Sequence, residues 1–167
     1  MLFSDEANDL RAFPQLLPLE VTGLLSRARL LRHAALEGRP APLLRGKNFG
    51  VLCEAQDSDD LALFRRAAEE LGAHVATVRP RLSAASSAQE ARHTARMLGR
   101  LYDAVECQGI DPALVRQIAQ HAGIPVYQGA ATASHPTARL AELLGDTASA
   151  ADNRRFVLQA WLLESIA

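Results

Sequence analysis

A chain of 167 residues, 49% of them hydrophobic, can bury one core, so we expect one domain, or one domain with an appendage. The 18 Lys and Arg against 19 Asp and Glu give a net charge of −1, which argues against nucleic acid or a membrane surface as a partner. The chain has no apolar run of membrane-spanning length, and its N-terminus is acidic, unlike a signal peptide, so we expect a cytoplasmic soluble protein.

The first predicted element is an amphipathic helix. Residues 1–16 show no sustained period, and we expect an extension there that packs loosely or onto a neighbouring chain. From Glu20 to Leu36, apolar residues recur at helical spacing, and the Gly and Pro residues of 38–42 end the pattern. The apolar positions of this predicted helix are Val21, Leu24, Leu25, Ala28, Leu31 and Ala35.

The stretch from Gly46 to Gly72 predicts a strand, a loop and a helix. Asn48–Cys53 is short and apolar, which is typical of a strand buried on both faces. Residues 57–60, Asp-Ser-Asp-Asp, are helix-start residues, and apolar residues then follow at helical spacing to the stop at Gly72. In open parallel sheets, ligands bind at such junctions, beyond the carboxyl end of the strand.

Strands and helices continue to alternate after Gly72. We predict a second buried strand at 73–78, further strands at 104–107 and 124–127, helices at 91–102 and from Pro112 to Gly123, and a mobile surface loop at 82–89. The alternation indicates an α/β fold, a parallel sheet of about four strands with helices on both faces. Cys53 and Cys107 each end a predicted strand and are expected to be free thiols, although a disulfide stays possible.

Four motifs resemble the aspartate/ornithine carbamoyltransferase family. Gly46, Lys47, Phe64, Ala67, Leu71 and Gly72 match that family's phosphate-binding segment without a gap. Residues 94–104, TARMLGRLYDA, resemble its Asp-Thr-Ala-Arg-x-Leu-x-x-x-x-Asp-Ala pattern, the most specific of the four. His135-Pro136 matches its His-Pro-x-Gln motif, and Asp152-Asn153-Arg154 resembles the Glu-Asn-Arg start of its C-terminal helix.

The resemblance implies a domain layout. Residues 1–145 correspond to the family's carbamoyl-phosphate-binding domain, and 146–167 to a linker and a C-terminal helix that packs back onto it. Since only residues 146–167 follow Gly145, we expect the family's second, amino-acid-binding domain to be absent.

The same resemblance locates a degenerate ligand pocket. Asp57, Ser58, Asp59, Asp60 and Leu61 replace the Ser-Thr-Arg-Thr-Arg residues that hold the phosphate in the family. Gln108 stands where the family has a phosphate-contacting Arg. His135 and Pro136 are kept, but Ala138 replaces the Gln that follows them. Acidic side chains therefore stand where the family has arginine guanidinium groups, whose paired N–H donors are the groups that phosphate sites rely on.

The three aspartates have alternative interpretations. Asp at a helix start stabilises the helix, by about 0.5–2 kcal/mol as a cap and about 0.3–1 kcal/mol through the dipole. A second interpretation is that the acids hold a divalent cation or an amine, and a third is a phospho-acceptor of the response-regulator type. We predict no bound metal. We also predict no cofactor, since the sequence contains no Gly-x-Gly-x-x-Gly or phosphate-loop motif that would bind a nucleotide.

The functional expectation follows from these losses. We expect a carbamoyltransferase-like protein without catalytic residues, which acts as an assembly or regulatory module. The resemblance implies a homotrimer, as in family enzymes, and an active carbamoyltransferase is a candidate partner. The alternative is a binder of an amino acid, amine or metal, or a residual carbamoyltransferase with altered ligand preference, that uses His135 and the aspartates.

Overall fold

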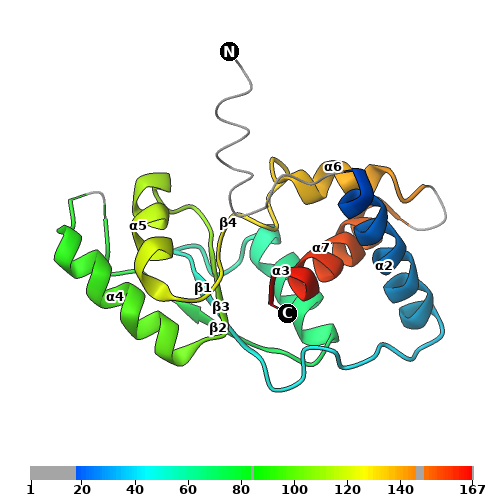
Figure 1. Ribbon diagram of the computed structural model, residues 1–167, viewed down its shortest axis with the longest axis horizontal. Helices are drawn as coiled ribbons and strands as arrows, with labels where there is room; N and C mark the ends of the chain where they lie inside the picture. Colours follow the sequence, from blue (N-terminus) through cyan, green and yellow to red (C-terminus); the bar gives the residue numbers. More distant parts are fainter. Residues whose placement is uncertain (1–17, 84, 146–148, 167) are drawn as a thin grey trace, which may run out of the picture.

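The structure, a computed structural model, describes residues 18–83, 85–145 and 149–166 (Figure 1). In this range it confirms the alternation of strands and helices. The helices are α2 (Pro18–Leu36), α3 (Asp59–Glu70), α4 (Ala88–Leu101), α5 (Pro112–Ala122), α6 (Pro136–Glu142) and α7 (Ala150–Ile166). The strands are β1 (Asn48–Leu52), β2 (His74–Val78), β3 (Ala104–Cys107) and β4 (Val126–Gln128).

The four strands form one parallel sheet in the order β2-β1-β3-β4. Figure 1 shows α4 and α5 on one face of the sheet, and α2, α3, α6 and α7 on the other. The chain runs outward from β1 to β2 in one direction and through β3 to β4 in the other. The carboxyl ends of β1 and β3 therefore lie side by side where the strand order reverses, which is where open α/β sheets bind ligands.

One strand prediction was wrong about burial. The segment 73–78 was expected to be buried, but β2 is an edge strand whose residues are exposed or half-buried. The sequence HVATV is apolar enough for a central strand, and only the strand order places it at the edge. The burial predicted for the first strand is confirmed, since every residue of β1 after Asn48 is buried, and every residue of β3 is buried as well.

Side-chain caps fix where the helices start. Ser58, Ser87 and Asp111 each accept a hydrogen bond from a backbone N–H of the helix that follows, at 3.1, 3.1 and 2.8 Å. Because Ser87 caps α4, this helix starts at Ala88, and the predicted loop at 82–89 is shorter than expected. At the other end of α5, Gly123 takes the left-handed conformation (φ 72°) that closes a helix, as predicted.

A close helix contact explains the glycine inside α4. A Cβ atom built on Gly99 would lie 2.0 Å from the carbonyl oxygen of Ala122 in α5. No side chain fits there, so glycine permits α4 and α5 to pack at this distance and form the layer on their face of the sheet.

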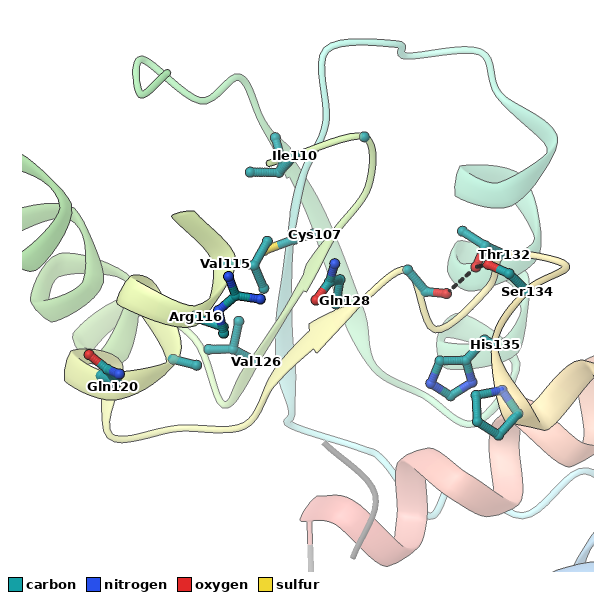
Figure 2. Close-up of a pocket in the computed structure, with 14 residues that line it drawn as sticks. Cys107, Ile110, Val115, Arg116, Gln120, Val126, Gln128, Thr132, Ser134 and His135 are labelled. Carbon is teal, nitrogen blue, oxygen red and sulfur yellow. Dashed lines mark hydrogen bonds between the residues drawn. The ribbon is translucent and has the colours of Figure 1, made fainter. Parts of the chain in front are cut away.

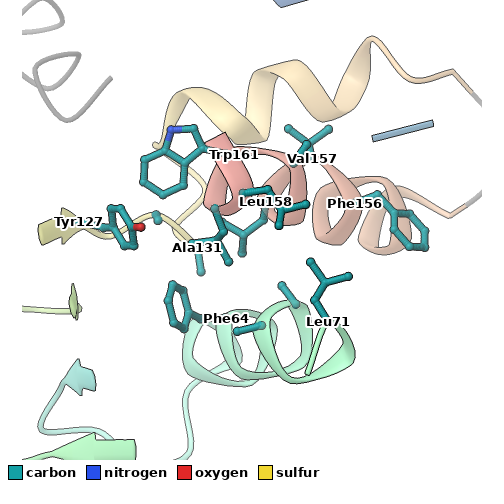
Figure 3. Close-up of a cluster of buried hydrophobic side chains, with 14 of the residues drawn as sticks. Phe64, Leu71, Tyr127, Ala131, Phe156, Val157, Leu158 and Trp161 are labelled. Atoms are coloured by element: carbon teal, nitrogen blue, oxygen red, sulfur yellow. The ribbon is translucent and has the colours of Figure 1, made fainter. Parts of the chain in front are cut away.

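The larger core lies between the sheet and the helices of the other face. Figure 3 shows Phe64 of α3 and Leu71, the residue that caps the end of α3, facing Phe156, Leu158 and Trp161 of α7, all of them buried. α7 also packs against α2 and α6. The predicted apolar face of this helix is confirmed, but burial extends around the whole helix from Asn153 to Leu163.

Burial of α7 includes four polar residues, and each has partners. Asn153 donates to Gly145 O at 2.8 Å, and Gln159 donates to Ala67 O at 3.2 Å. Arg155 bonds Asp152 at 2.7 Å and lies 4.5 Å from the centre of the Phe156 ring. Arg154 belongs to the site described below. These contacts attach the C-terminal helix to several elements of the fold by polar as well as apolar groups.

Two predicted segments lie outside the described residues. They are the extension at 1–16 and the first part of the linker, 146–148. Within the part of the chain that the structure describes, no helix combines the length and apolar character needed to cross a membrane.

Candidate functional site

The N-terminus of α3 carries the acidic segment predicted from the sequence. Ser58 is its cap, since its Oγ accepts from Leu61 N at 3.1 Å, and Asp59 and Asp60 lie in the first turn. Asp57 and Asp59 are exposed, and Asp60 is half-buried. The helix-start interpretation is therefore confirmed, with Ser58 as the capping side chain.

Two further findings limit what this helix start can bind. Leu61 is 4% exposed and belongs to the core, so the side chain at the last position of the segment points away from solvent. Among residues 18–83, 85–145 and 149–166, no three His, Cys, Asp or Glu side chains are grouped so that they could hold a metal ion. The metal alternative for the three aspartates thus has no geometric support in the described chain.

Gln108 follows β3 and is hydrogen-bonded to the carboxyl end of the neighbouring strand β1. Its backbone N–H donates to Leu52 O at 2.9 Å, and its buried side-chain amide donates from Nε2 to Glu106 Oε2 at 3.4 Å. Its Oε1 has no hydrogen-bond partner among the described residues. Turning the amide over would exchange Nε2 and Oε1, and Oε1 could then accept the proton of a protonated Glu106.

Glu106 is a fully buried acid in the middle of β3. Its carboxylate accepts hydrogen bonds from the backbone N–H groups of Ala130 and Ala131, at 2.9 and 3.2 Å. Burial raises the pKa of this carboxyl group to about 7, because the hydrogen bonds and the positive charge of Arg154 offset only part of the desolvation. Glu106 therefore holds the segment that follows β4 against the sheet.

His135 caps α6 and lies beneath the C-terminal helix. Its Nδ1 accepts from Thr137 N at 3.3 Å and lies 2.9 Å from Thr137 Oγ1, and its ring meets the Trp161 ring edge-on at 4.9 Å. Because an amide N–H points at Nδ1, the neutral ring carries its proton on Nε2. Burial, followed by the charge of Arg154, lowers the pKa of His135 to about 3, so the imidazole is neutral at pH 7.

Arg154 connects α7 to the segment between β4 and α6. Its guanidinium donates to Ala130 O at 2.7 Å, to Thr132 O at 3.0 Å and to the hydroxyl of Thr137. Burial lowers its pKa to about 10, while the charges of Glu106 and Asp60 act in the opposite direction. At pH 7 the group stays charged, and its partners are oxygens from the segment that places His135.

The predicted site residues thus divide into two groups. His135 and Gln108 belong to one buried network. Gln108 bonds Glu106, which accepts from Ala130 N, and Arg154 donates to Ala130 O and to the Thr137 hydroxyl beside His135. Pro136 is the first residue of α6 and lines a cavity with His135. Of the acidic segment, only Asp60 interacts with this network, through its charge effect on Arg154.

The cavity lies over β4, between α5 and the start of α6 (Figure 2), and has a volume of about 540 Å³. Its lining includes Cys107, Arg116, Gln128 and Ser134 besides His135 and Pro136. None of its described lining residues comes from 57–60. This cavity is therefore built beside β4, and the start of α3 does not contribute to its described lining.

Sequence reasoning missed Glu106, Thr137 and the role of Arg154. A charged residue in the middle of the buried run AVEC was a signal for Glu106, since a buried acid needs partners. The pair Arg154-Arg155, which precedes the apolar run of the last helix, was a weaker signal for the role of Arg154. No feature of the sequence pointed to Thr137, because its structural role comes from hydrogen bonds with Ala130 and Arg154, which lie 7 and 17 positions away.

Comparisons with known proteins support the family resemblance. Residues 9–145 match the family model described as the aspartate/ornithine carbamoyltransferase, carbamoyl-P binding domain. An ornithine carbamoyltransferase of Actinobacillus pleuropneumoniae serotype 5b is 36% identical over 125 residues, 75% of this chain and 37% of that protein. A catabolic ornithine carbamoyltransferase of Burkholderia mallei is 37% identical over 125 residues, with the same coverage.

A solved structure also supports the family resemblance. The ornithine carbamoyltransferase of Pyrococcus furiosus superposes with a TM-score of 0.63 at 25% identity, over 75% of this chain and 40% of that one. The chain thus spans little more than a third of the length of the curated relatives it matches. By its sequence and its fold, it belongs to the aspartate/ornithine carbamoyltransferase family, through the carbamoyl-phosphate-binding domain.

Proposed function

We propose that this protein does not turn over carbamoyl phosphate and that it serves as an assembly or regulatory module with a carbamoyltransferase scaffold. The observation that carries the proposal is the start of α3, where Asp57, Asp59 and Asp60 stand in place of the family's phosphate-holding residues. Its relatives are named as carbamoyltransferases, and that activity is what the proposal denies to this chain.

Electrostatics support the loss of phosphate binding. One carboxylate about 5 Å from one phosphate charge costs roughly 3 kcal/mol at an effective dielectric constant near 20. The Ser58 hydroxyl is already used as the helix cap, and Leu61, in the place of an Arg, is packed in the core. Gln108 is neutral and bonded to Glu106, so it brings no charge that could replace the family's Arg.

The proposal is tested by offering the full chain carbamoyl phosphate with ornithine or with aspartate and measuring the carbamoylated amino acid. We expect no product, and no perturbation of the amides of residues 57–61 by inorganic phosphate in NMR spectra. Turnover by the wild-type chain would refute the proposal.

A matched pair of variants isolates the role of charge. The triple variant Asp57→Ser/Asp59→Arg/Asp60→Thr restores the family pattern at three solvent-accessible positions and leaves Leu61 buried. It should bind phosphate measurably. The control Asp57→Asn/Asp59→Asn/Asp60→Asn removes the acids without adding a cation and should bind phosphate more weakly than the triple variant.

Assembly is the second part of the proposal. The family's enzymes are trimers built through this domain, so we propose a homotrimer, or a complex with an active carbamoyltransferase. Light scattering should give a mass three times 18.0 kDa. A monomer at all concentrations, together with no co-purifying carbamoyltransferase, would refute the assembly role without affecting the question of turnover.

A further inference from the structure

We propose that the cavity over β4 is a binding site for a small organic monocarboxylate. The guanidinium of Arg116 would receive the carboxylate, and the apolar side chains of the cavity would contact the hydrocarbon body. This inference goes beyond the proposed function and does not depend on whether turnover is lost.

The shape of the cavity suits a small ligand. Its volume of about 540 Å³ lies within the range of about 300–1,000 Å³ typical of small-molecule sites. One wall is α5, with Val115 and Arg116, and the opposite wall is the segment that carries Ser134 and His135. Figure 2 shows Arg116 reaching from α5 toward the Gln128 amide, with the His135 ring on the far side of β4.

The charge of the lining favours an anion with a single charge. Arg116 is the one Lys or Arg side chain in the described lining, which contains no Asp or Glu, and a guanidinium group is a permanent cation. Burial raises the pKa of the Cys107 thiol to about 12, and burial of His135 keeps its imidazole neutral, so neither group adds a charge. The cavity therefore has a net charge of about +1 at neutral pH.

Arg116 is available for such a ligand. It is exposed and forms no hydrogen bond or ion pair with any other described residue. A guanidinium pairs with a carboxylate through two parallel N–H···O bonds, a geometry that a single Arg satisfies. A phosphate dianion would need a second positive group. The start of α5 supplies none, since Pro112 lacks an N–H and Asp111 already accepts from Ala113 N.

Apolar side chains complete the site. Ile110, Val115 and Val126 line the same cavity as Arg116, and Ile110 and Val126 are only half-buried, so their apolar surface is partly exposed to solvent. Covering this surface with a hydrocarbon chain is favourable, by about 25 cal/mol for each Å² removed from water. The amide of Gln128 can donate to a carboxylate oxygen held by Arg116.

The test uses butyrate as the probe and its neutral isostere, butyramide, as the comparison. The ¹⁵N-labelled full chain is titrated with each compound, and separately with inorganic phosphate, while backbone amide shifts are followed. Two variants accompany the wild type. Arg116→Gln removes the charge at the cavity, and Arg100→Gln removes the same charge from an exposed position on α4 outside it.

We expect butyrate to shift the amides of Ile110, Val126 and Gln128 in a saturable manner. Binding should weaken about tenfold or more in Arg116→Gln, stay unchanged in Arg100→Gln, and be weaker for butyramide than for butyrate. No saturable shift at these amides, or equal butyrate affinity in Arg116→Gln and wild type, would overturn the proposal. Phosphate binding at these amides as tightly as butyrate would overturn the assignment to monocarboxylates.

Discussion

Two helix starts at the same edge of the sheet differ in how the protein uses them. α3 and α6 are each capped by a side chain, Ser58 in one case and His135 in the other. Asp57 and Asp59, around the start of α3, are exposed, whereas His135 at the start of α6 is buried beneath Trp161 and shares Thr137 with Arg154. A change of charge at the start of α3 should therefore cost little stability, whereas a change of charge at the start of α6 should cost much more.

This difference explains how His135 can persist in a chain whose phosphate-holding residues are replaced. The His135 ring caps a helix, contacts Trp161 and lies in a network that reaches Glu106 in β3 and Arg154 in α7. These contacts are a structural reason for a histidine at this position, independent of any ligand. Substitutions at the two helix starts should therefore differ in their effects on stability.

Arg154→Ala should give the largest loss of stability. It removes donors to Ala130 O, Thr132 O and Thr137 Oγ1 and leaves the buried Glu106 without its nearby positive charge. We expect the free energy of unfolding to fall by about 3–5 kcal/mol, measured by denaturant titration. The control Arg29→Ala, at an exposed position on α2, should change it by less than about 0.5 kcal/mol. A similar small loss in Arg154→Ala would contradict the role given to this residue.

Glu106 should make the folded state more stable at acidic pH. Its pKa is about 7 in the folded protein and ordinarily 4.5, so between these values the folded state binds the proton and the unfolded state does not. This contribution to stability is complete below about pH 4.5 and is lost as the pH rises to about 7, by roughly 3 kcal/mol in total. Glu106→Gln should remove it, seen as a change in the pH slope of unfolding relative to wild type. Identical slopes in the two proteins would show that Glu106 does not titrate in this range.

His135 should act with the opposite sign. Its pKa is about 3 in the folded protein and ordinarily 6.5, so below pH 6.5 the unfolded state gains a proton that the folded state resists. Its contribution to stability is complete above pH 6.5 and falls by about 1.4 kcal/mol for each pH unit below it.

The variant His135→Asn checks this prediction, because Asn keeps a capping side chain. Its unfolding free energy should fall less than that of wild type as the pH is lowered from 6.5. In the wild type, Glu106 and His135 partly offset each other, so the two single variants should diverge in opposite directions. If the unfolding free energy of Glu106→Gln and that of His135→Asn depended on pH in the same way, the opposite pKa shifts of Glu106 and His135 would be contradicted.

The start of α3 should tolerate change better than the start of α6. Ser58→Ala loses the cap on Leu61 N and should cost about 1 kcal/mol, and Asp59→Asn should cost about 0.3–1 kcal/mol through the helix dipole. Thermal unfolding of both variants beside wild type measures these effects. A loss from Asp59→Asn as large as that from Arg154→Ala would erase the contrast between the two helix starts.

Local patterns were sufficient for most of the fold. The period of apolar residues predicted the helices, and Asp111, Pro112 and Gly123 marked the ends of α5 correctly because capping depends on neighbours in sequence. The boundaries of β3 were predicted residue by residue. The edge position of β2 was not, because HVATV has the composition of a central strand and its place depends on which strand pairs with β1.

The candidate site was predicted only in part. The acidic charge at the start of α3 and the presence of His135 follow from residue type at a recognisable position in the sequence. Long-range contacts in the folded chain bring Glu106, Thr137 and Arg154 together around the segment carrying His135 and place Arg116 in the lining of a cavity over β4. The physical reason is that a buried polar group must find its partners wherever the chain brings them, and Arg154 reaches Ala130 across 24 positions of sequence.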